Sequence, residues 1–214
     1  MSNITKNASA ICVLCGDRPA SSGQGDHIPP KSLYPKKERM SAKYRFHTVP
    51  ACVECNNEGK LADEALKVMI SAQTGGRRHN SDDVVEHLVK TFHKNNKIGE
   101  KFFSIETPTY FDDGSEFVPK YPVSGNFELA KKALSRIARA MYWSITGEIL
   151  PKNRKVYLID DAEHANKIRI LANKYNPESF EINGSTFRCV VSDVDGLLIM
   201  TMIFFEARQY MVTM

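Results

Sequence analysis

Apolar residues recur at helical spacing in four segments of the chain. In the first, apolar side chains return every three or four positions until Gly75-Gly76, which predicts a helix that begins near Cys52. Ser81 is a residue of the helix-capping type and precedes a second such segment. The predicted helices cover residues 52–75, 81–92, 126–145 and 162–175.

The segment that Asn126 caps has the clearest helical pattern. Its apolar side chains form one stripe, which we expect to face the core. The stripe consists of Phe127, Ala130, Leu134, Ile137, Ala138, Met141 and Ile145. The basic residues of this helix lie mostly off the stripe; they are Lys131, Lys132, Arg136 and Arg139.

Two short strands are predicted ahead of the first helix. Asp26-His27-Ile28 should form a strand that ends at Pro29-Pro30, because proline cannot donate a hydrogen bond to a strand ladder. Residues 46–51 form a second strand that leads directly into the helix. The sequence therefore predicts a strand-strand-helix unit in the N-terminal part of the chain.

Further strands are predicted in the C-terminal part. Residues 102–125 contain several Pro and Asp residues and suit short strands and turns, and residues 155–159 form another strand. The tail over residues 186–213 is rich in strand-forming residues. Within it, Asp195-Gly196 separates two apolar runs, which is a strong signal for a hairpin turn.

These elements predict an α+β fold. We expect an N-terminal ββα module with a treble-clef-like arrangement, followed by a region of mixed helices and antiparallel strands. The predicted parts are a first domain over residues 1–75, a helical linker region over 76–125 and a C-terminal α+β domain of open role over 126–214.

The composition is that of a soluble globular protein. Of the 214 residues, 42% are apolar and 25% are charged. The longest apolar run, Leu197 to Phe205, is too short to span a bilayer. Residues 1–6 lack the hydrophobic core of a signal peptide, so we expect a cytoplasmic protein and no membrane partner.

Four of the five cysteines form two Cys-x-x-Cys pairs. In a reducing cytosol such pairs favour a metal ion over disulfides, and four thiolates suit a structural zinc ion. A redox role would instead call for a single pair at the start of a helix. The predicted zinc ligands are Cys12, Cys15, Cys52 and Cys55, whereas Cys189 lies in an apolar strand and should be a buried small side chain.

The residues between and beside these pairs suggest a second, catalytic metal. Asp26 and Asn56 offer a carboxylate and an amide oxygen, the ligand types that Mg²⁺ or Mn²⁺ prefers. His27 has an ordinary pKa near about 6.5 and can act as a general base on water. In an ideal strand, His27 points to the opposite face from Asp26, so a bend at Pro29-Pro30 would have to bring both into one cleft.

The order Cys-x-x-Cys, Asp-His, Cys-x-x-Cys-Asn resembles the HNH (His-Me finger, ββα-metal) endonucleases. It is most similar to the zinc-binding branch that includes phage endonuclease VII, and the resemblance covers roughly residues 10–75. The resemblance implies that Asp26 and Asn56 bind the catalytic ion, that His27 activates water and that the four cysteines hold zinc. The family pattern has an Asn where this chain has His47, which is a candidate for orienting His27.

Charge is concentrated in the segment that carries these motifs. The chain has 29 Lys/Arg and 25 Asp/Glu; residues 1–60 hold nine and five of them, which leaves 20 of each for the remainder. This local excess fits a polyanionic partner. The candidate phosphate-contacting residues are Lys31, Lys36, Lys37, Arg39, Lys43, Arg45 and Lys60.

The sequence thus predicts a metal-dependent endonuclease that hydrolyses DNA phosphodiester bonds. Double-stranded DNA is the expected partner, with RNA as the alternative substrate and with phage defence or restriction among the possible roles. The C-terminal region offers a surface for a second copy of the chain or for a protein partner. The competing interpretation is a non-catalytic zinc-finger module that binds nucleic acid or protein, which would need the four cysteines but not Asp26, His27 and Asn56 together.

Overall fold

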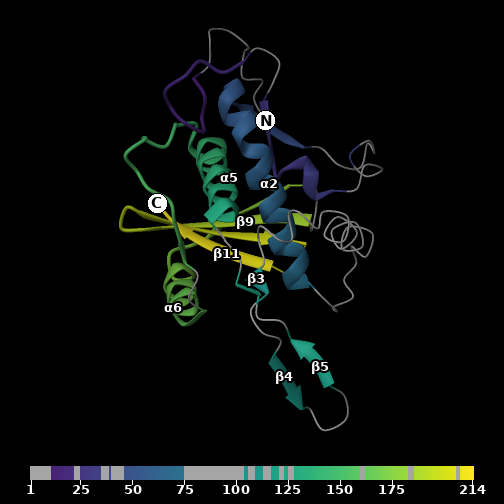
Figure 1. Ribbon diagram of the computed structural model, residues 1–214. Helices are drawn as coiled ribbons and strands as arrows, with labels where there is room; N and C mark the ends of the chain where they lie inside the picture. The colour runs from purple at the N-terminus through teal and green to yellow at the C-terminus, as the bar shows by residue number, and fades with distance from the viewer. Residues whose placement is uncertain are drawn as a thin grey trace.

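The computed structural model shows an α+β protein with antiparallel sheets, and this part of the predicted fold class is confirmed (Figure 1). The predicted helix over residues 81–92 lies outside the residues that the structure describes. The described residues are 11–21, 25–34, 39, 46–74, 104–105, 109–112, 117–120, 123–124, 128–159, 162–182, 186–205 and 208–214.

The N-terminal part of the described chain is a two-stranded ribbon followed by a long helix. Strands β1 (Gly25–Ile28) and β2 (His47–Pro50) pair antiparallel, with Asp26 opposite Val49. Helix α2 (Val53–Thr74) begins shortly after β2. These elements lie where the sequence predicts them. Because side chains alternate along a strand, Asp26 is buried on one face of the ribbon and His27 points to the other.

The segment that follows β1 connects the ribbon to the C-terminal sheet. It forms a short 3-10 helix, η1 (Lys31–Leu33), which the sequence did not predict. Tyr34, directly after it, is fully buried, and its hydroxyl lies 2.9 Å from the hydroxyl of Thr186. The ring of Tyr34 also packs edge-on against Phe205 at 5.8 Å between centroids.

The C-terminal part contains a five-stranded antiparallel sheet with the strand order β7-β11-β10-β9-β8. Asp195 and Gly196 join β9 to β10 and both have positive φ angles, 54° and 84°, as a tight hairpin turn of this kind requires. The predicted hairpin is therefore confirmed. The strands are β7 (Tyr157–Ile159), β8 (Glu178–Ile182), β9 (Phe187–Val194), β10 (Leu197–Phe204) and β11 (Arg208–Thr213).

Strand β8 was not predicted from the sequence. It lies at the edge of the sheet and pairs only with β9 among the described strands. None of its residues is fully buried, so its sequence, Glu-Ser-Phe-Glu-Ile, lacks the apolar density that marks a central strand.

Helices cover both faces of this sheet. Figure 1 shows α2 and α5 (Glu128–Thr146) side by side on one face and α6 (Ala162–Ala172) on the other. Helix α5 agrees with the predicted helix over residues 126–145, and its stripe faces the core as predicted: Leu134, Ile137 and Ala138 are buried. Beneath α6, a small apolar cluster contains Ala172, Val194, Ile199 and Met211.

The described residues between 102 and 125, where the sequence predicts strands and turns, form four short strands. They pair as β3 with β6 and as β4 with β5. Their bounds are β3 (Ser104–Ile105), β4 (Thr109–Asp112), β5 (Phe117–Lys120) and β6 (Val123–Ser124).

One hydrophobic core joins the N-terminal and C-terminal parts of the described chain. It runs from Cys12 through Leu66 of α2 and Leu134 of α5 to Phe204 of β10 and Met214. Cys189 belongs to it and is fully buried, as predicted. The predicted boundaries at 75/76 and 125/126 fall outside the described residues, so the division into three parts stays a prediction.

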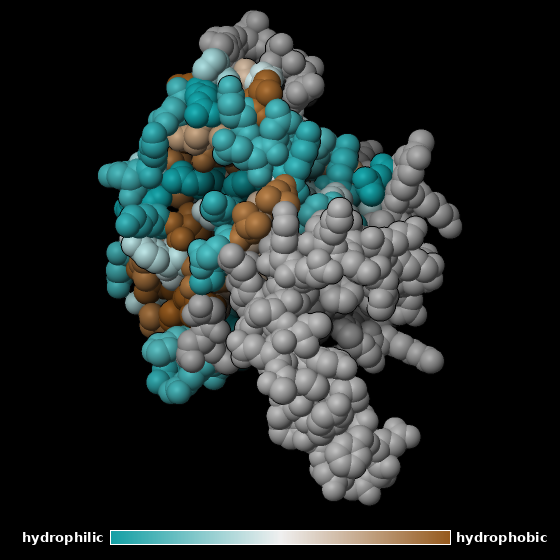
Figure 2. Space-filling view, in the orientation of Figure 1, coloured by the Kyte–Doolittle hydropathy of each residue, from teal (hydrophilic) through white to brown (hydrophobic). Residues whose placement is uncertain are grey.

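On the face shown in Figure 2, hydrophilic side chains cover much of the described surface, with apolar ones between them. Exposed large apolar side chains include Val53 and Leu61 of α2 and Ile170 and Leu171 of α6. Among the described helices, none combines the length and the apolar character that crossing a membrane would require.

Candidate functional site

Four cysteines converge where the ribbon meets α2. Cys12 and Cys15 lie in a tight turn that the amide of Gly16 closes by donating to the carbonyl of Cys12 at 2.8 Å. Gly16 has a φ of +72°, which suits glycine best. Cys52 precedes α2 and Cys55 lies in its first turn, where the Cys55 amide donates to the Cys52 sulfur at 3.4 Å.

The sulfur atoms of these cysteines all lie within 4.8 Å of one another. Four sulfurs around one zinc ion, each about 2.3 Å from the metal, would be roughly 3.8 Å apart, so the observed cluster needs little adjustment to hold one. The donor set is also the soft, all-thiolate type that favours zinc. The predicted cluster can therefore hold a metal ion such as zinc.

Burial and mutual proximity set the protonation of these thiols. Burial raises the pKa of Cys12 and of Cys55, and the neighbouring thiols raise the pKa of Cys55 further. Burial acts in the same direction on Cys15, but backbone hydrogen bonds from Asp17 and Arg18, together with hydrogen bonds from the thiols of Cys12 and Cys55, bring its pKa down to about 7. A divalent cation at the centre would stabilise the thiolate form of the whole cluster.

Asp26 of β1 is buried, and its side chain faces α5. One carboxylate oxygen accepts a hydrogen bond from the backbone amide of His27 at 3.0 Å, and the other accepts one from Arg136 Nη2 at 2.5 Å. Burial raises the pKa of Asp26, while the adjacent Arg136 guanidinium opposes the increase. These two hydrogen bonds leave about half of the acceptor positions of the carboxylate unused.

Arg136 continues from Asp26 to a second carboxylate. Its Nη1 donates to Asp63 of α2 at 3.0 Å, and its side chain is only 16% exposed. A Cβ added at Gly59 would overlap the Arg136 guanidinium, so the guanidinium packs against α2 in the space that the absent side chain of Gly59 leaves. Burial, more than the charges around it, raises the pKa of Asp63 to about 7.

The ion pairs of Arg136 with Asp26 and Asp63 were not predicted from the sequence. Arg136 lies off the apolar stripe of α5, as predicted, yet its side chain reaches back into a buried ion pair. The sequence feature that could have indicated this packing is Gly59, because a glycine inside a helix often marks the close approach of another group.

His27 lies on the opposite face of β1 from Asp26 and is half-buried. Its ring packs edge-on against Phe46 at 6.3 Å between centroids. Burial lowers the pKa of His27, and nearby Lys31 lowers it further, against the opposing effect of Asp26. The imidazole is therefore neutral near pH 7, the form that can accept a proton.

Asn56 lies in the first turn of α2, directly after Cys55, and its backbone amide donates to the backbone carbonyl of Cys52 at 3.1 Å. Its position is thus fixed by the cysteine cluster. Asp26 and His27 are neighbours on β1, but their side chains lie on opposite faces, and no hydrogen bond between described residues joins the side chains of Asp26, His27 and Asn56.

His47 lies opposite Ile28, and Ile28 is on the same face of β1 as Asp26. His47 and Asp26 therefore share the face of the ribbon that packs against α5, which we call the inner face. Its Nε2 is 2.7 Å from the hydroxyl of Ser144, and that hydroxyl donates to the carbonyl of Ala140 at 2.8 Å. With its single proton used there, the hydroxyl accepts from Nε2. Burial lowers the pKa of His47, and the hydrogen bond directs its ring to α5.

The predicted phosphate-contacting residues are described only in part. Lys36, Lys37, Lys43 and Arg45 lie outside the described residues. The Lys31 ammonium lies 5.2 Å from the centre of the Phe46 ring, Arg39 donates to the carbonyl of Tyr34 at 2.9 Å, and exposed Lys60 donates to Asn57 at 3.0 Å.

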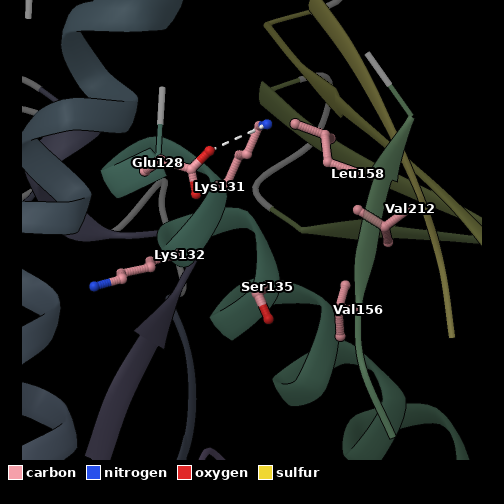
Figure 3. Close-up of a pocket in the computed structure, with 7 residues that line it drawn as sticks. All are labelled: Glu128, Lys131, Lys132, Ser135, Val156, Leu158 and Val212. Atoms are coloured by element: carbon pink, nitrogen blue, oxygen red, sulfur yellow. Dashed lines mark ion pairs between the residues drawn. The ribbon is translucent and has the colours of Figure 1, made fainter. Parts of the chain in front are cut away.

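A separate pocket of about 240 Å³ lies between α5 and strands β7 and β11 (Figure 3). Lys131 and Glu128 form an ion pair of 3.3 Å at its edge, and apolar side chains from the strand side face α5. The pocket contains none of the residues predicted for the site. Its lining consists of Glu128, Lys131, Lys132, Ser135, Val156, Leu158 and Val212.

The chain matches no protein-family model, no curated protein and no solved structure.

Proposed function

We propose that the protein is a metal-dependent endonuclease of the HNH type that hydrolyses DNA phosphodiester bonds. The observation that carries the proposal is the cysteine cluster at the junction of the ribbon and α2. The backbone amide of Val13, in the first cysteine turn, donates to the carbonyl of Pro50 at the end of β2, and that of Ser21 donates to the carbonyl of Ala51. A zinc ion there would fix the strand that carries Asp26 and His27 relative to the helix turn that carries Asn56.

In this proposal Asp26 and Asn56 supply oxygen ligands to a catalytic Mg²⁺ or Mn²⁺. When bound, such an ion supplies Lewis-acid stabilisation of the phosphodiester and of the leaving oxygen. His27 accepts the proton of the attacking water, for which its lowered pKa keeps it neutral at pH 7. His47 shapes the inner face of the ribbon through Ser144 and is a supporting residue.

The substrate surface follows from charge. Lys31 lies in η1, directly after β1, exposed Lys60 lies on α2, and exposed Arg39 donates to the carbonyl of Tyr34. Residues 1–60 also carry the whole net charge of +4. We propose that this surface contacts the phosphate backbone of double-stranded DNA, which fixes the scissile phosphate without reading its sequence.

The proposal is tested with zinc-loaded protein and supercoiled plasmid. The wild type should nick and linearise the plasmid with Mg²⁺ or Mn²⁺ and stop when EDTA is added. His27→Ala should lose at least about 100-fold in rate while keeping its zinc and its helix content. His164→Ala, a change of the same kind on α6, should keep wild-type activity. Full activity in His27→Ala would remove His27 as the base.

A second function is favoured by one observation. The Asp26 carboxylate is engaged by Arg136, and His27 points to the other face of β1, which is an arrangement that a non-catalytic zinc module tolerates. Such a module would shift DNA in a gel without cutting it under any divalent ion. The same protein samples therefore separate the two functions.

A further inference from the structure

The ion pair of Asp26 and Arg136 is part of a buried row of three charges. Asp26 is 7% exposed, and the side chains of Arg136 and Asp63 are 16% and 17% exposed. Burying a charge is costly unless it is paired and hydrogen-bonded. Here each carboxylate receives its own nitrogen of the same guanidinium, so the planar Arg136 side chain links β1 to α2.

The position of the guanidinium is fixed from several sides. Asp63 holds Nη1, Asp26 holds Nη2, and Gly59 provides the space that a Cβ would fill. The Nε atom is buried and has no hydrogen-bond partner among the described residues. The two carboxylates and the surface of α2, rather than a third hydrogen bond, therefore set the orientation of Arg136.

This arrangement orients Asp26 in turn. Its Oδ1 is held by the His27 amide and its Oδ2 by Arg136, so the carboxylate has one preferred rotation. Hydrogen bonds of this kind to a metal-binding carboxylate orient it, and their loss typically weakens metal binding by about 10- to 100-fold.

We propose that Arg136 is a positioning residue for the catalytic cation site, acting through Asp26 and held in place by Asp63. The inference rests on the proposed function, in which Asp26 binds the cation. It adds a residue from α5, outside the segment that resembles HNH nucleases, and makes the N-terminal site depend on the C-terminal part of the chain.

The test measures Mn²⁺ binding to the full-length zinc-loaded protein by calorimetry, so that it does not depend on activity. Asp26→Asn should abolish binding. Arg136→Met should weaken it by about 10- to 100-fold. Arg136→Lys keeps the positive charge but cannot bridge two carboxylates, so it should weaken binding as well and show that orientation, not charge alone, is required.

Arg139→Met is the matched control. Arg139 lies one turn further along α5 and donates to the carbonyls of Leu150, Pro151 and Arg154, without contact to Asp26. It should bind Mn²⁺ as the wild type does. Zinc content and circular dichroism identify any variant that fails to fold, in which case Arg136→Lys carries the test.

The outcomes separate this inference from the proposed function. Equal Mn²⁺ binding by the wild type and Asp26→Asn would remove the proposed cation site and this inference with it. Lost binding in Asp26→Asn, with affinities within about threefold of wild type in both Arg136 variants, would overturn the inference alone. Tighter binding in Arg136→Met would also overturn it, because Arg136 would then compete with the cation.

Discussion

The charge of Asp63 depends on the fold. Burial raises its pKa to about 7 from an ordinary value of 3.8, with Arg136 lowering it and Asp26 and Glu64 raising it. The folded state therefore binds a proton more tightly than the unfolded state does. For such a group, the free energy of unfolding is highest below about pH 4 and decreases as the pH rises to about 7.

We expect Asp63→Asn to remove this pH dependence, because the amide stays neutral. Relative to the wild type, the variant should gain stability between pH 4.5 and 7.5, by up to about 4 kcal/mol. Urea unfolding of both proteins at several pH values measures the difference, in which the pH dependence of the cysteine cluster cancels. A constant difference across this pH range would contradict the expected protonation of Asp63.

Site residues that belong to a motif with regular spacing could be predicted from the sequence, and residues outside any such motif could not. The four cysteines were predicted as one cluster from their spacing and do converge. Arg136 and Asp63 are 73 positions apart and belong to no motif, so only the packing of α5 against α2 brings them together. For Asp26, His27 and Asn56, the predicted roles stay predictions.

At the scale of elements, the contact between α2 and α5 depends on Gly59. Replacing a helical glycine by alanine normally stabilises a helix by about 1 kcal/mol. At Gly59 the new Cβ would overlap the Arg136 guanidinium, and overpacking typically costs about 1–3 kcal/mol. We therefore expect Gly59→Ala to lower the free energy of unfolding in urea. A gain in stability would show that Arg136 does not pack against this position.

The ribbon and the start of α2 depend on the metal in our account. Cys55→Ala should reduce bound zinc from about one per chain to nearly none and lower the helix content, because a structural zinc site supplies folding energy. Cys189→Ala is the control, since Cys189 is buried in β9 and belongs to no cysteine pair. Metal analysis and circular dichroism report both results. Retained zinc in Cys55→Ala would exclude the four-cysteine site.

Elements with a strong periodic pattern were the predictable ones. Helices α2 and α5 and the β9–β10 hairpin lie where apolar spacing and Asp195-Gly196 placed them. The edge strand β8 and the 3-10 helix η1 were missed, because an exposed edge strand and a single short turn leave little pattern in the sequence.

At the scale of the whole molecule, one core connects the cysteine cluster to the C-terminal sheet. The two parts should therefore unfold together. Trp143, the single tryptophan, lies on α5 against this core, and zinc release reports the N-terminal site. We expect Trp143 fluorescence and zinc release to change at the same urea concentration. Two separate transitions would show that the halves are independent.

We propose that a zinc ion in the cysteine cluster holds in place the elements that carry Asp26, His27 and Asn56 for phosphodiester hydrolysis. The decisive experiment is plasmid cleavage by wild type, Asp26→Asn and Asn56→Ala, with zinc content measured on the same samples. We expect Mg²⁺- or Mn²⁺-dependent cleavage by the wild type and, at unchanged zinc content, at least about a 100-fold loss of rate in both variants, on the order expected for removing a catalytic group. Wild-type cleavage rates in those variants, or DNA left intact by zinc-loaded wild-type protein with either ion, would contradict this proposal.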